Sequence, residues 1–550
     1  MSNFNTFNLY LLSLKKRLQE RSREKKFSSS GYNISLNGIQ PHRIFESSNI
    51  FLIQDLINSD PIILNSIRKF TTNIWKITNL EENKIKKLHN FSWLPALNIK
   101  TEKELACLII DQWINNFANY NSKYWSLDTL TMRLIFWISS YEIIFKNTDL
   151  IFRSKVINNI VKQTKHLYQN INLVDLGVEK IKSLAALILV GNSFEQYEDY
   201  TRFGLNNLES ELNNFINKDG FVKSKNPEDL YWTLYFLVLI KEWLILSQKQ
   251  TPAFINSYIN ALGVCFKFLR FSNGDVPLFN GANHVNTEKF YEFLESRGYE
   301  FSNMDNIFCS YAKLKSKKIE LFIDANNPAS TLYSKNFQAG ALSFELASNG
   351  IKFICNSGSG KNLGEELFYL SSSTAAHSTL TINDTSSCIF QKNSQIRKYF
   401  GNSLIEKYSI YKKELKNEKE QIQCIVAHNG YEKKFKTLHE RQITLFKTKN
   451  HIEGIDTLQC RNLENNSLNF SVRFHIHPNI RITKTMGNDI LLSSPEGDGW
   501  IFRSPQIPTK IEKNLYFGDP DNIKESSFIL LEGNIENKIT NIIWHLEKAK

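Results

Sequence analysis

Apolar side chains recur at helical spacing through roughly the first half of the chain. In the segment TEKELACLIIDQWINNFANY, Leu105, Leu108, Ile109 and Trp113 follow one another at steps that place them on one face of a helix. The same spacing recurs in residues 129–145, 178–190, 205–216, 229–246 and 255–271. Short polar segments separate these stretches, so the pattern predicts antiparallel helical hairpins stacked side by side.

The period changes to two near Asn306. In ALSFELA and the following IKFIC, apolar residues alternate with others, and an Asn349–Gly350 pair lies between the two segments. An Asn-Gly pair flanked by alternating residues predicts a tight β-hairpin. Strand-like segments continue to the C-terminus. The sequence therefore predicts an α+β protein with two domains, helical over residues 1–305 and an antiparallel β-sandwich over residues 306–550.

Composition narrows the class of protein further. A chain of 550 residues exceeds what one hydrophobic core usually organises, and no apolar stretch is long enough to span a bilayer. The net charge of +12 would suit an anionic partner, but the basic residues are spread along the chain, so we expect no nucleic-acid partner. The seven cysteines show no CxxC spacing, which predicts neither a disulfide framework nor a zinc knuckle.

The N-terminal segment MSNFNTFNLYLLSLKKRLQERSREKKF has an apolar patch followed by basic residues. This order is the reverse of a secretory signal, and it predicts an amphipathic basic helix. We therefore expect a cytoplasmic protein, with the cell envelope or periplasm as the alternative.

Two short motifs in the second half could bind a ligand or serve the fold alone. NSGSGKN, residues 356–362, lacks phosphate-loop spacing and is interpreted as a glycine-rich turn after a buried strand. SVRFHIHP predicts a strand with one apolar face and one polar face, the polar one formed by Arg473, His475 and His477. We interpret that polar face as the outer surface of the sandwich; a metal site or an acidic-ligand groove is the alternative.

Two further segments have both a structural and a functional interpretation. The loop FNGAN, residues 279–283, either contacts a substrate or merely connects two helices. Glu228 and Asp229 resemble half of a carboxylate pair for glycoside chemistry, but acidic residues are also favoured at a helix start, which is the interpretation we prefer.

Longer motifs resemble a known family. QAGALSFELASNGIKFICNSG, STAAHSTLTINDTSS, SVRFHIHP and GWIFRS are similar to the C-terminal domain of the heparinase II/III-like polysaccharide lyases of alphaproteobacteria. WLPAL, RLIFWISS, KDGFVKSKNPEDL and FLRFSNGDVPLFNGA extend the likeness into the first half. The resemblance implies an incomplete α/α toroid followed by an antiparallel β-sandwich.

The resemblance also implies a site, from which this chain departs. Active relatives hold a metal at positions that correspond here to Gln338, Asn356 and His377. Because amide oxygens are poor zinc partners, we expect no cofactor and no metal at these three residues. Val222 and Ser224 occupy the positions of a typical His and Glu, and Tyr231 is displaced by two residues from the typical Tyr.

The predicted function follows from the family. Its lyases cleave uronic-acid-containing acidic polysaccharides by β-elimination, which needs a base, an acid and a group that neutralises the uronate carboxylate. We expect His377 and Tyr231 as candidate catalytic residues. Candidate substrate-binding residues are Asn226, Asn280, Gln338, Asn356, Arg473 and His475. The alternative is a catalytically reduced member that binds an acidic glycan or cell-envelope polymer without cleaving it, with His377 bracing the sandwich through the two amides.

Overall fold

The computed structural model describes residues 2–69, 74–76, 81–461 and 468–549. These residues form two compact units. The helical unit comprises Leu14–Phe215 and Trp232–Asn260, and the β-rich unit comprises Met1–Ser13, Ile216–Tyr231 and Ala261–Lys550. The domain boundary predicted at residues 305 and 306 stays a prediction.

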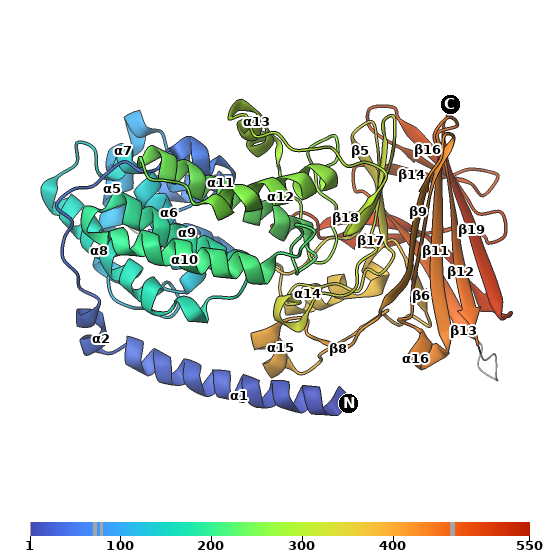
Figure 1. The fold of residues 1–550 in the computed structure, drawn as a ribbon, viewed down its shortest axis with the longest axis horizontal. Helices are drawn as coiled ribbons and strands as arrows, with labels where there is room; N and C mark the ends of the chain where they lie inside the picture. The colour runs from blue at the N-terminus through green and yellow to red at the C-terminus, as the bar shows by residue number, and fades with distance from the viewer. Residues whose placement is uncertain (1, 70–73, 77–80, 462–467, 550) are drawn as a thin grey trace. The chain divides into compact units, whose positions relative to one another are not determined.

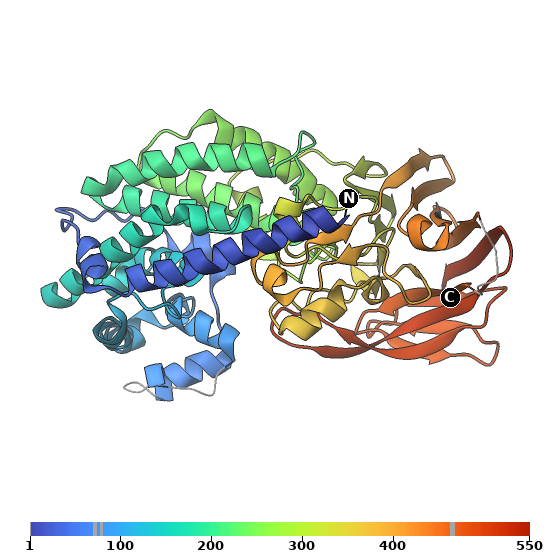
Figure 2. The same cartoon turned by 90° about the horizontal axis from the view of Figure 1, so that it is seen from below.

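Antiparallel helices form the helical unit (Figure 1 and Figure 2). The described helices of the first half are α1 Ser2–Phe27, α2 Ser30–Ser35, α3 Pro61–Lys69, α4 Glu82–His89, α5 Ile99–Phe117, α6 Leu127–Ser139, α7 Tyr141–Ile144, α8 Leu150–Gln169, α9 Val178–Ser193, α10 Glu198–Phe215, α11 Pro227–Leu246 and α12 Ala253–Leu269. Short 3-10 turns lie between them at η1 Ile50–Leu56, η2 Ile74–Lys76, η3 Leu94–Ala96, η4 Ile171–Leu173 and η5 Glu195–Tyr197. In this unit α9 packs against both α6 and α10, and α5 packs against α8.

The predicted helical stripes are confirmed with one correction. Ile109 and Trp113 of α5 are fully buried, as their spacing predicts. Leu108 is 45% exposed, because the residues that α5 buries are centred on Ile109, Ile110 and Trp113, and Leu108 lies at the edge of that face. None of the helices in the described part of the chain combines the length and the apolar character needed to cross a bilayer.

Two large antiparallel sheets dominate the β-rich unit (Figure 1). The first has the order β1-β2-β3-β4-β5-β13-β18-β17, with β6 also paired to β13. Its strands are β1 Phe308–Cys309, β2 Tyr311–Ser316, β3 Ile319–Ile323, β4 Phe344–Ser348, β5 Ile351–Cys355, β6 Leu380–Ile382, β13 Leu468–Ile476, β17 Lys510–Tyr516 and β18 Lys524–Ile535.

The second large sheet has the order β14-β15-β16-β19-β12-β11-β10-β9. Its strands are β9 Ile410–Asn417, β10 Gln421–His428, β11 Thr437–Phe446, β12 His451–Cys460, β14 Arg481–Lys484, β15 Ile490–Ser493, β16 Gly499–Arg503 and β19 Ile539–Lys548. Figure 1 shows β11, β12 and β19 side by side in orange and red. A small third sheet pairs β7 Ile389–Phe390 with β8 Leu404–Glu406.

The main core of the β-rich unit lies between the two large sheets. Phe344, Phe353 and Phe474 from the first sheet share one buried cluster with Trp500 and Trp544 from the second. Phe344 stacks on Trp544 with ring centroids 5.3 Å apart. Burial of large apolar side chains from both faces is what holds a sandwich together, so the predicted fold class is confirmed.

The predicted hairpin is present between β4 and β5. Ser348 pairs with Ile351, and the two loop residues have the positive φ angles of a type I′ turn, 51° at Asn349 and 79° at Gly350. A few short helices accompany the strands of the β-rich unit. The unit also contains α13 Glu288–Ser296, α14 Glu365–Ser372, α15 Ser394–Phe400 and α16 Glu432–Phe435, with short 3-10 turns η6 Thr331–Tyr333 and η7 Thr374–Ala376.

Candidate functional site

Gln338 lies at the centre of a buried polar network in the β-rich unit. Its Nε2 donates to the carbonyl oxygens of Gly358 and Ser371, both at 2.9 Å, and its Oε1 accepts from the backbone N–H of Gly281 at 2.9 Å. This pattern fixes the orientation of the amide, because the NH₂ group faces two carbonyls and the oxygen faces an N–H. Gln338 therefore joins three separate backbone segments.

His377 follows η7, and only 1% of it is exposed. Its Nδ1 lies 2.9 Å from the carbonyl oxygen of Ser373, and its Nε2 lies 3.3 Å from Oε1 of Gln338. Burial lowers the pKa of His377 to about 4, so the ring is neutral at pH 7. A neutral imidazole has a single N–H, and the shorter contact assigns it to Nδ1.

Asn356 and His475 complete this amide–histidine network, which we define as Gln338, Asn356, His377 and His475. Oδ1 of Asn356 accepts from the backbone N–H of Ser378, not from the His377 ring as expected. His475 Nε2 donates to the carbonyl of Ala375 at 2.9 Å, and its Nδ1 lies 2.8 Å from Nδ2 of Asn514.

The expected outer polar face of β13 is corrected by this geometry. His475 is 1% exposed, because η7 on one side and β17 and β18 on the other cover it. Burial lowers its pKa to about 3. Arg473 is only partly covered, and its guanidinium donates to Thr381 Oγ1 at 2.8 Å and to Asp384 Oδ1 at 3.1 Å.

The FNGAN loop connects the network to the start of α11. The backbone N–H of Asn283 donates to Oε2 of Glu228 at 2.9 Å, and Nζ of Lys361 donates to the same oxygen at 2.7 Å and to the carbonyl of Gly281. Oδ1 of Asn283 accepts from the backbone N–H of Ser359. Glu228 thus does more than the predicted helix-end electrostatics: it ties three segments together.

The remaining predicted residues take different positions. Asn226 caps α11, since its Oδ1 accepts from the backbone N–H groups of Glu228 and Asp229. Tyr231 is 1% exposed and packs against Phe266 and Phe290. The structure therefore brings Gln338, Asn356, His377 and His475 together and places Tyr231 in an aromatic cluster. The catalytic and substrate-binding roles assigned to these residues stay predictions.

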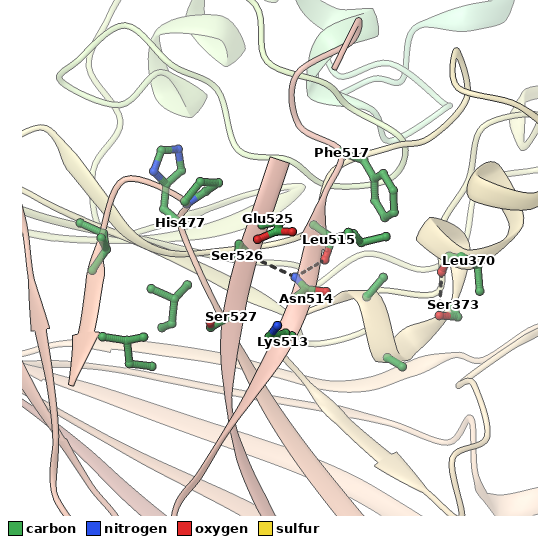
Figure 3. A pocket seen from close by; sticks show the side chains of 17 residues that line it. Leu370, Ser373, His477, Lys513, Asn514, Leu515, Phe517, Glu525, Ser526 and Ser527 are labelled. Atoms are coloured by element: carbon green, nitrogen blue, oxygen red, sulfur yellow. Dashed lines mark hydrogen bonds between the residues drawn. The ribbon is translucent and has the colours of Figure 1, made fainter. Parts of the chain in front are cut away.

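A groove of about 630 Å³ borders the network (Figure 3). Lys513 and Asn514 of β17 and Ser526 and Ser527 of β18 line it, together with His477. Nδ2 of Asn514 is within hydrogen-bonding distance of Ser526 Oγ as well as His475 Nδ1, so Asn514 links the groove to the buried histidine. No sequence pattern pointed to Asn514.

A second cavity, of about 580 Å³, is lined by three lysines, Lys225, Lys412 and Lys413, and is called here the lysine pocket. Lys225, Lys413, Asp219 and Ser310 are among its lining residues. Lys225 Nζ lies 3.4 Å from Ser310 Oγ, which in turn donates to Oδ2 of Asp219 at 3.2 Å. The backbone of Lys225 and that of Ser310 both have a φ of 61°, which is the uncommon left-handed conformation.

The electrostatics of the lysine pocket are unusual. Desolvation lowers the pKa of Lys225, and the negative charges of Asp219 and Asp324 offset part of that decrease. Desolvation also lowers the pKa of Lys413, and the charge of Lys225 lowers it further. Burial raises the pKa of Asp324 to about 6, although the carboxylate accepts from Asn326 and from Nδ2 of Asn280. Asn280 therefore holds Asp324, the residue that precedes Ala325 and Asn326 in the pocket lining.

Sequence reasoning missed the lysine pocket. Lys225 and Lys413 lie far apart in the chain, and on β9 the pair Lys412–Lys413 has the pattern of an ordinary solvated edge strand. Lys412 indeed forms an ion pair with Glu440 at 2.9 Å. Only the tertiary fold places Lys413 beside Lys225.

The amide–histidine network does not fit a zinc ion. It offers two buried imidazoles and two amide oxygens, but His475 uses both ring nitrogens in other contacts. Each amide oxygen already accepts from a backbone N–H. None of these four residues offers a carboxylate or thiolate that would offset the loss of hydration of a buried divalent cation.

Known proteins share this fold. Residues 308–545 match the family described as heparinase II/III-like, C-terminal. FtsZ-localized protein C of Caulobacter vibrioides is 23% identical over 480 residues, which cover 84% of this chain and 81% of that protein. The solved structure of heparinase III has a TM-score of 0.68 at 14% identity and covers 96% of this chain and 91% of its own.

A mutant of heparan sulfate lyase HepC from Pedobacter heparinus has a TM-score of 0.62 at 12% identity, and covers 92% of this chain and 86% of its own. Helices followed by two antiparallel sheets therefore define a heparinase III-like two-domain fold. The chain therefore carries a heparinase II/III-like C-terminal domain over residues 308–545, and its overall fold is similar to that of heparinase III.

Proposed function

We propose that this protein binds an acidic, uronate-containing glycan in the lysine pocket and lacks ordinary β-elimination. The observation that carries the proposal is that Lys225 and Lys413 line one cavity, where the positive charge of Lys225 disfavours that of Lys413, which is itself exposed on β9. A carboxylate bound between them would relieve that repulsion and accept charge-assisted hydrogen bonds. Ser310 supplies a further polar group at the same wall.

The position of the predicted catalytic residues supports binding over cleavage. A lyase base must reach the proton at C5 of the uronate, and a lyase acid must reach the leaving oxygen. His377 and Tyr231 are each only 1% exposed, and the N–H of His377 is committed to the carbonyl of Ser373.

Cleavage by β-elimination is the second candidate. It is supported by the solved structures of similar fold, which include heparinase III, heparan sulfate lyase HepC and a chondroitin AC lyase. Incubating the full chain with uronate polymers and following the ultraviolet absorbance of an unsaturated product decides between the two. A product signal above that of a Tyr231→Phe, His377→Gln double variant would overturn the non-catalytic proposal.

Calorimetric titration with short uronate oligosaccharides tests the binding. Short ligands are needed because a chain of net charge +12 attracts any long polyanion. We expect saturable binding by the natural chain, and a loss of about tenfold or more in Lys225→Met and in Lys413→Met, since a charged hydrogen bond contributes about 1.5–3 kcal/mol. A neutral oligosaccharide should not bind.

Lys416→Met is the matched control, because Lys416 lies on the same strand, β9, and is exposed. It removes the same charge without touching the pocket. An equal loss in Lys416→Met would assign the binding to net charge and overturn the proposal, as would the absence of binding to every uronate oligosaccharide. Affinity should also fall as pH rises, beginning below the ordinary lysine pKa of about 10.4, because Lys225 and Lys413 have lowered pKa values.

A further inference from the structure

A cluster of two histidines and a glutamate lies on the outer face of the eight-stranded sheet. In the antiparallel pair β12 and β19, His451 is opposite Glu547 and Glu453 is opposite His545. Residues 452, 454, 544 and 546 alternate with these positions and are buried in the core, so the four side chains share the other face. Neighbouring pairs on one face of a sheet are within side-chain reach of one another.

The ligand atoms of three of these residues converge. One nitrogen each from His451 and His545 and one carboxylate oxygen of Glu453 lie within 4.8 Å of one another. Nδ1 of His545 is 3.8 Å from Oε2 of Glu453, and the two imidazole rings stack with centroids 5.3 Å apart. Two atoms that each bind the same zinc ion at about 2.1 Å lie at most about 4.2 Å apart, so small side-chain rotations close the set.

Burial distinguishes this cluster from an ordinary surface group. Nδ1 of His545 is buried and has no hydrogen-bond partner among the described residues. A buried nitrogen without a partner is uncommon in folded proteins and carries a desolvation penalty. The side chains of His451, Glu453 and His545 are only 18%, 32% and 25% exposed.

Neighbouring strands supply an outer layer of contacts. Nδ1 of His451 lies 3.5 Å from Oε1 of Glu547. Oε2 of Glu547 accepts a hydrogen bond from Nη1 of Arg503 at 2.6 Å. Arg503 is also paired with Asp489, so its positive charge is offset by two carboxylates. A ligand histidine that contacts a carboxylate through its other nitrogen is the common arrangement around zinc, because the carboxylate orients the ring and makes it more basic.

We propose that His451, Glu453 and His545 form a binding site for a divalent transition-metal ion of the zinc class. Two imidazoles and one carboxylate are a known zinc ligand set, and a fourth position stays open to water. The flanking charges favour a cation, since Glu453, Glu547 and Asp489 outnumber Arg503 and the nearby Lys449. The site is separate from the amide–histidine network, and it does not rest on the proposed glycan binding.

Competition with a chromophoric chelator tests the site in the full chain. After removal of metal by chelation and dialysis, we expect the natural chain to bind one equivalent of Zn²⁺ in the micromolar range or tighter. His545→Ala and His451→Ala should each weaken Zn²⁺ binding by about 100-fold. Loss of a residue that only supports a metal ligand weakens binding by up to about 100-fold, and loss of a ligand should cost as much. Co²⁺ in place of Zn²⁺ should give the visible absorption of a four- or five-coordinate N,O site in the natural chain alone.

His477→Ala is the matched control, because His477 is a partly exposed histidine of the β-rich unit outside the cluster. Its zinc affinity should equal that of the natural chain. Glu453→Gln, which keeps shape and polarity, separates ligand loss from misfolding and should weaken binding while the circular dichroism spectrum stays unchanged. No zinc binding by the natural chain, or unchanged binding in both histidine variants, would overturn the proposal.

Discussion

Truncating Gln338 to alanine tests whether the amide–histidine network is a structural brace. The side chain is fully buried and makes three hydrogen bonds, two to carbonyl oxygens and one from a backbone N–H. Each contributes about 1 kcal/mol net, and a partner left buried without water costs up to about 3 kcal/mol. With the cavity that replaces the amide, we expect Gln338→Ala to lower the free energy of unfolding by about 3–5 kcal/mol.

Urea denaturation followed by circular dichroism measures this loss, with Gln338→Met as the control. Methionine restores most of the volume but none of the hydrogen bonds. If unpaired backbone groups cause the loss, both variants should be destabilised by similar amounts. If Gln338→Met unfolds at the midpoint of the natural chain, or if Gln338→Ala loses less than about 1 kcal/mol, the network is not a brace.

Three further outcomes are expected. Because His475 has a pKa of about 3 when folded and about 6.5 when unfolded, the stability that its neutral ring gives the folded chain is fully present above pH 6.5. The free energy of unfolding should fall by about 2 kcal/mol at pH 5, and this fall should be smaller in His475→Asn. Asp456→Asn should cost about 3–5 kcal/mol in urea denaturation, because it leaves the fully buried Arg441 guanidinium without its carboxylate. Gly281→Ala should lower the melting temperature well below that of Gly298→Ala, since both glycines have positive φ but only the Cβ added at Gly281 would clash with a backbone oxygen, that of Asn336.

What the sequence predicted depends on how local the determining interactions are. The stripe of α5 and the Asn349–Gly350 turn follow from spacing and from the φ angles that asparagine and glycine tolerate, so both could be predicted. The burial of His475 could not, because alternation along β13 does not reveal that other segments cover its second face. The approach of Lys413 to Lys225 likewise depends on the tertiary fold alone.

The position of the proton on His377 decides whether His377 and Gln338 stabilise each other or only their own backbone segments. If Nε2 of His377 carried the proton, it would donate to Oε1 of Gln338 and the pair would be coupled by about 1 kcal/mol. The proton is instead on Nδ1, which faces the carbonyl of Ser373, so a lone pair of Nε2 faces an oxygen that already accepts from Gly281. The two side chains then stabilise different backbone segments and lie side by side without attraction.

A double-mutant cycle with Gln338→Met, His377→Phe and the combined variant measures this coupling. We expect an interaction energy near zero or slightly repulsive, because each substitution removes contacts to backbone and neither removes a bond between the two side chains. A favourable coupling of about 1 kcal/mol or more would place the proton on Nε2 and make the pair a true hydrogen bond. It would also leave Nδ1 as an acceptor opposite a carbonyl, so the assignment of the tautomer and the meaning of the network are decided by the same measurement.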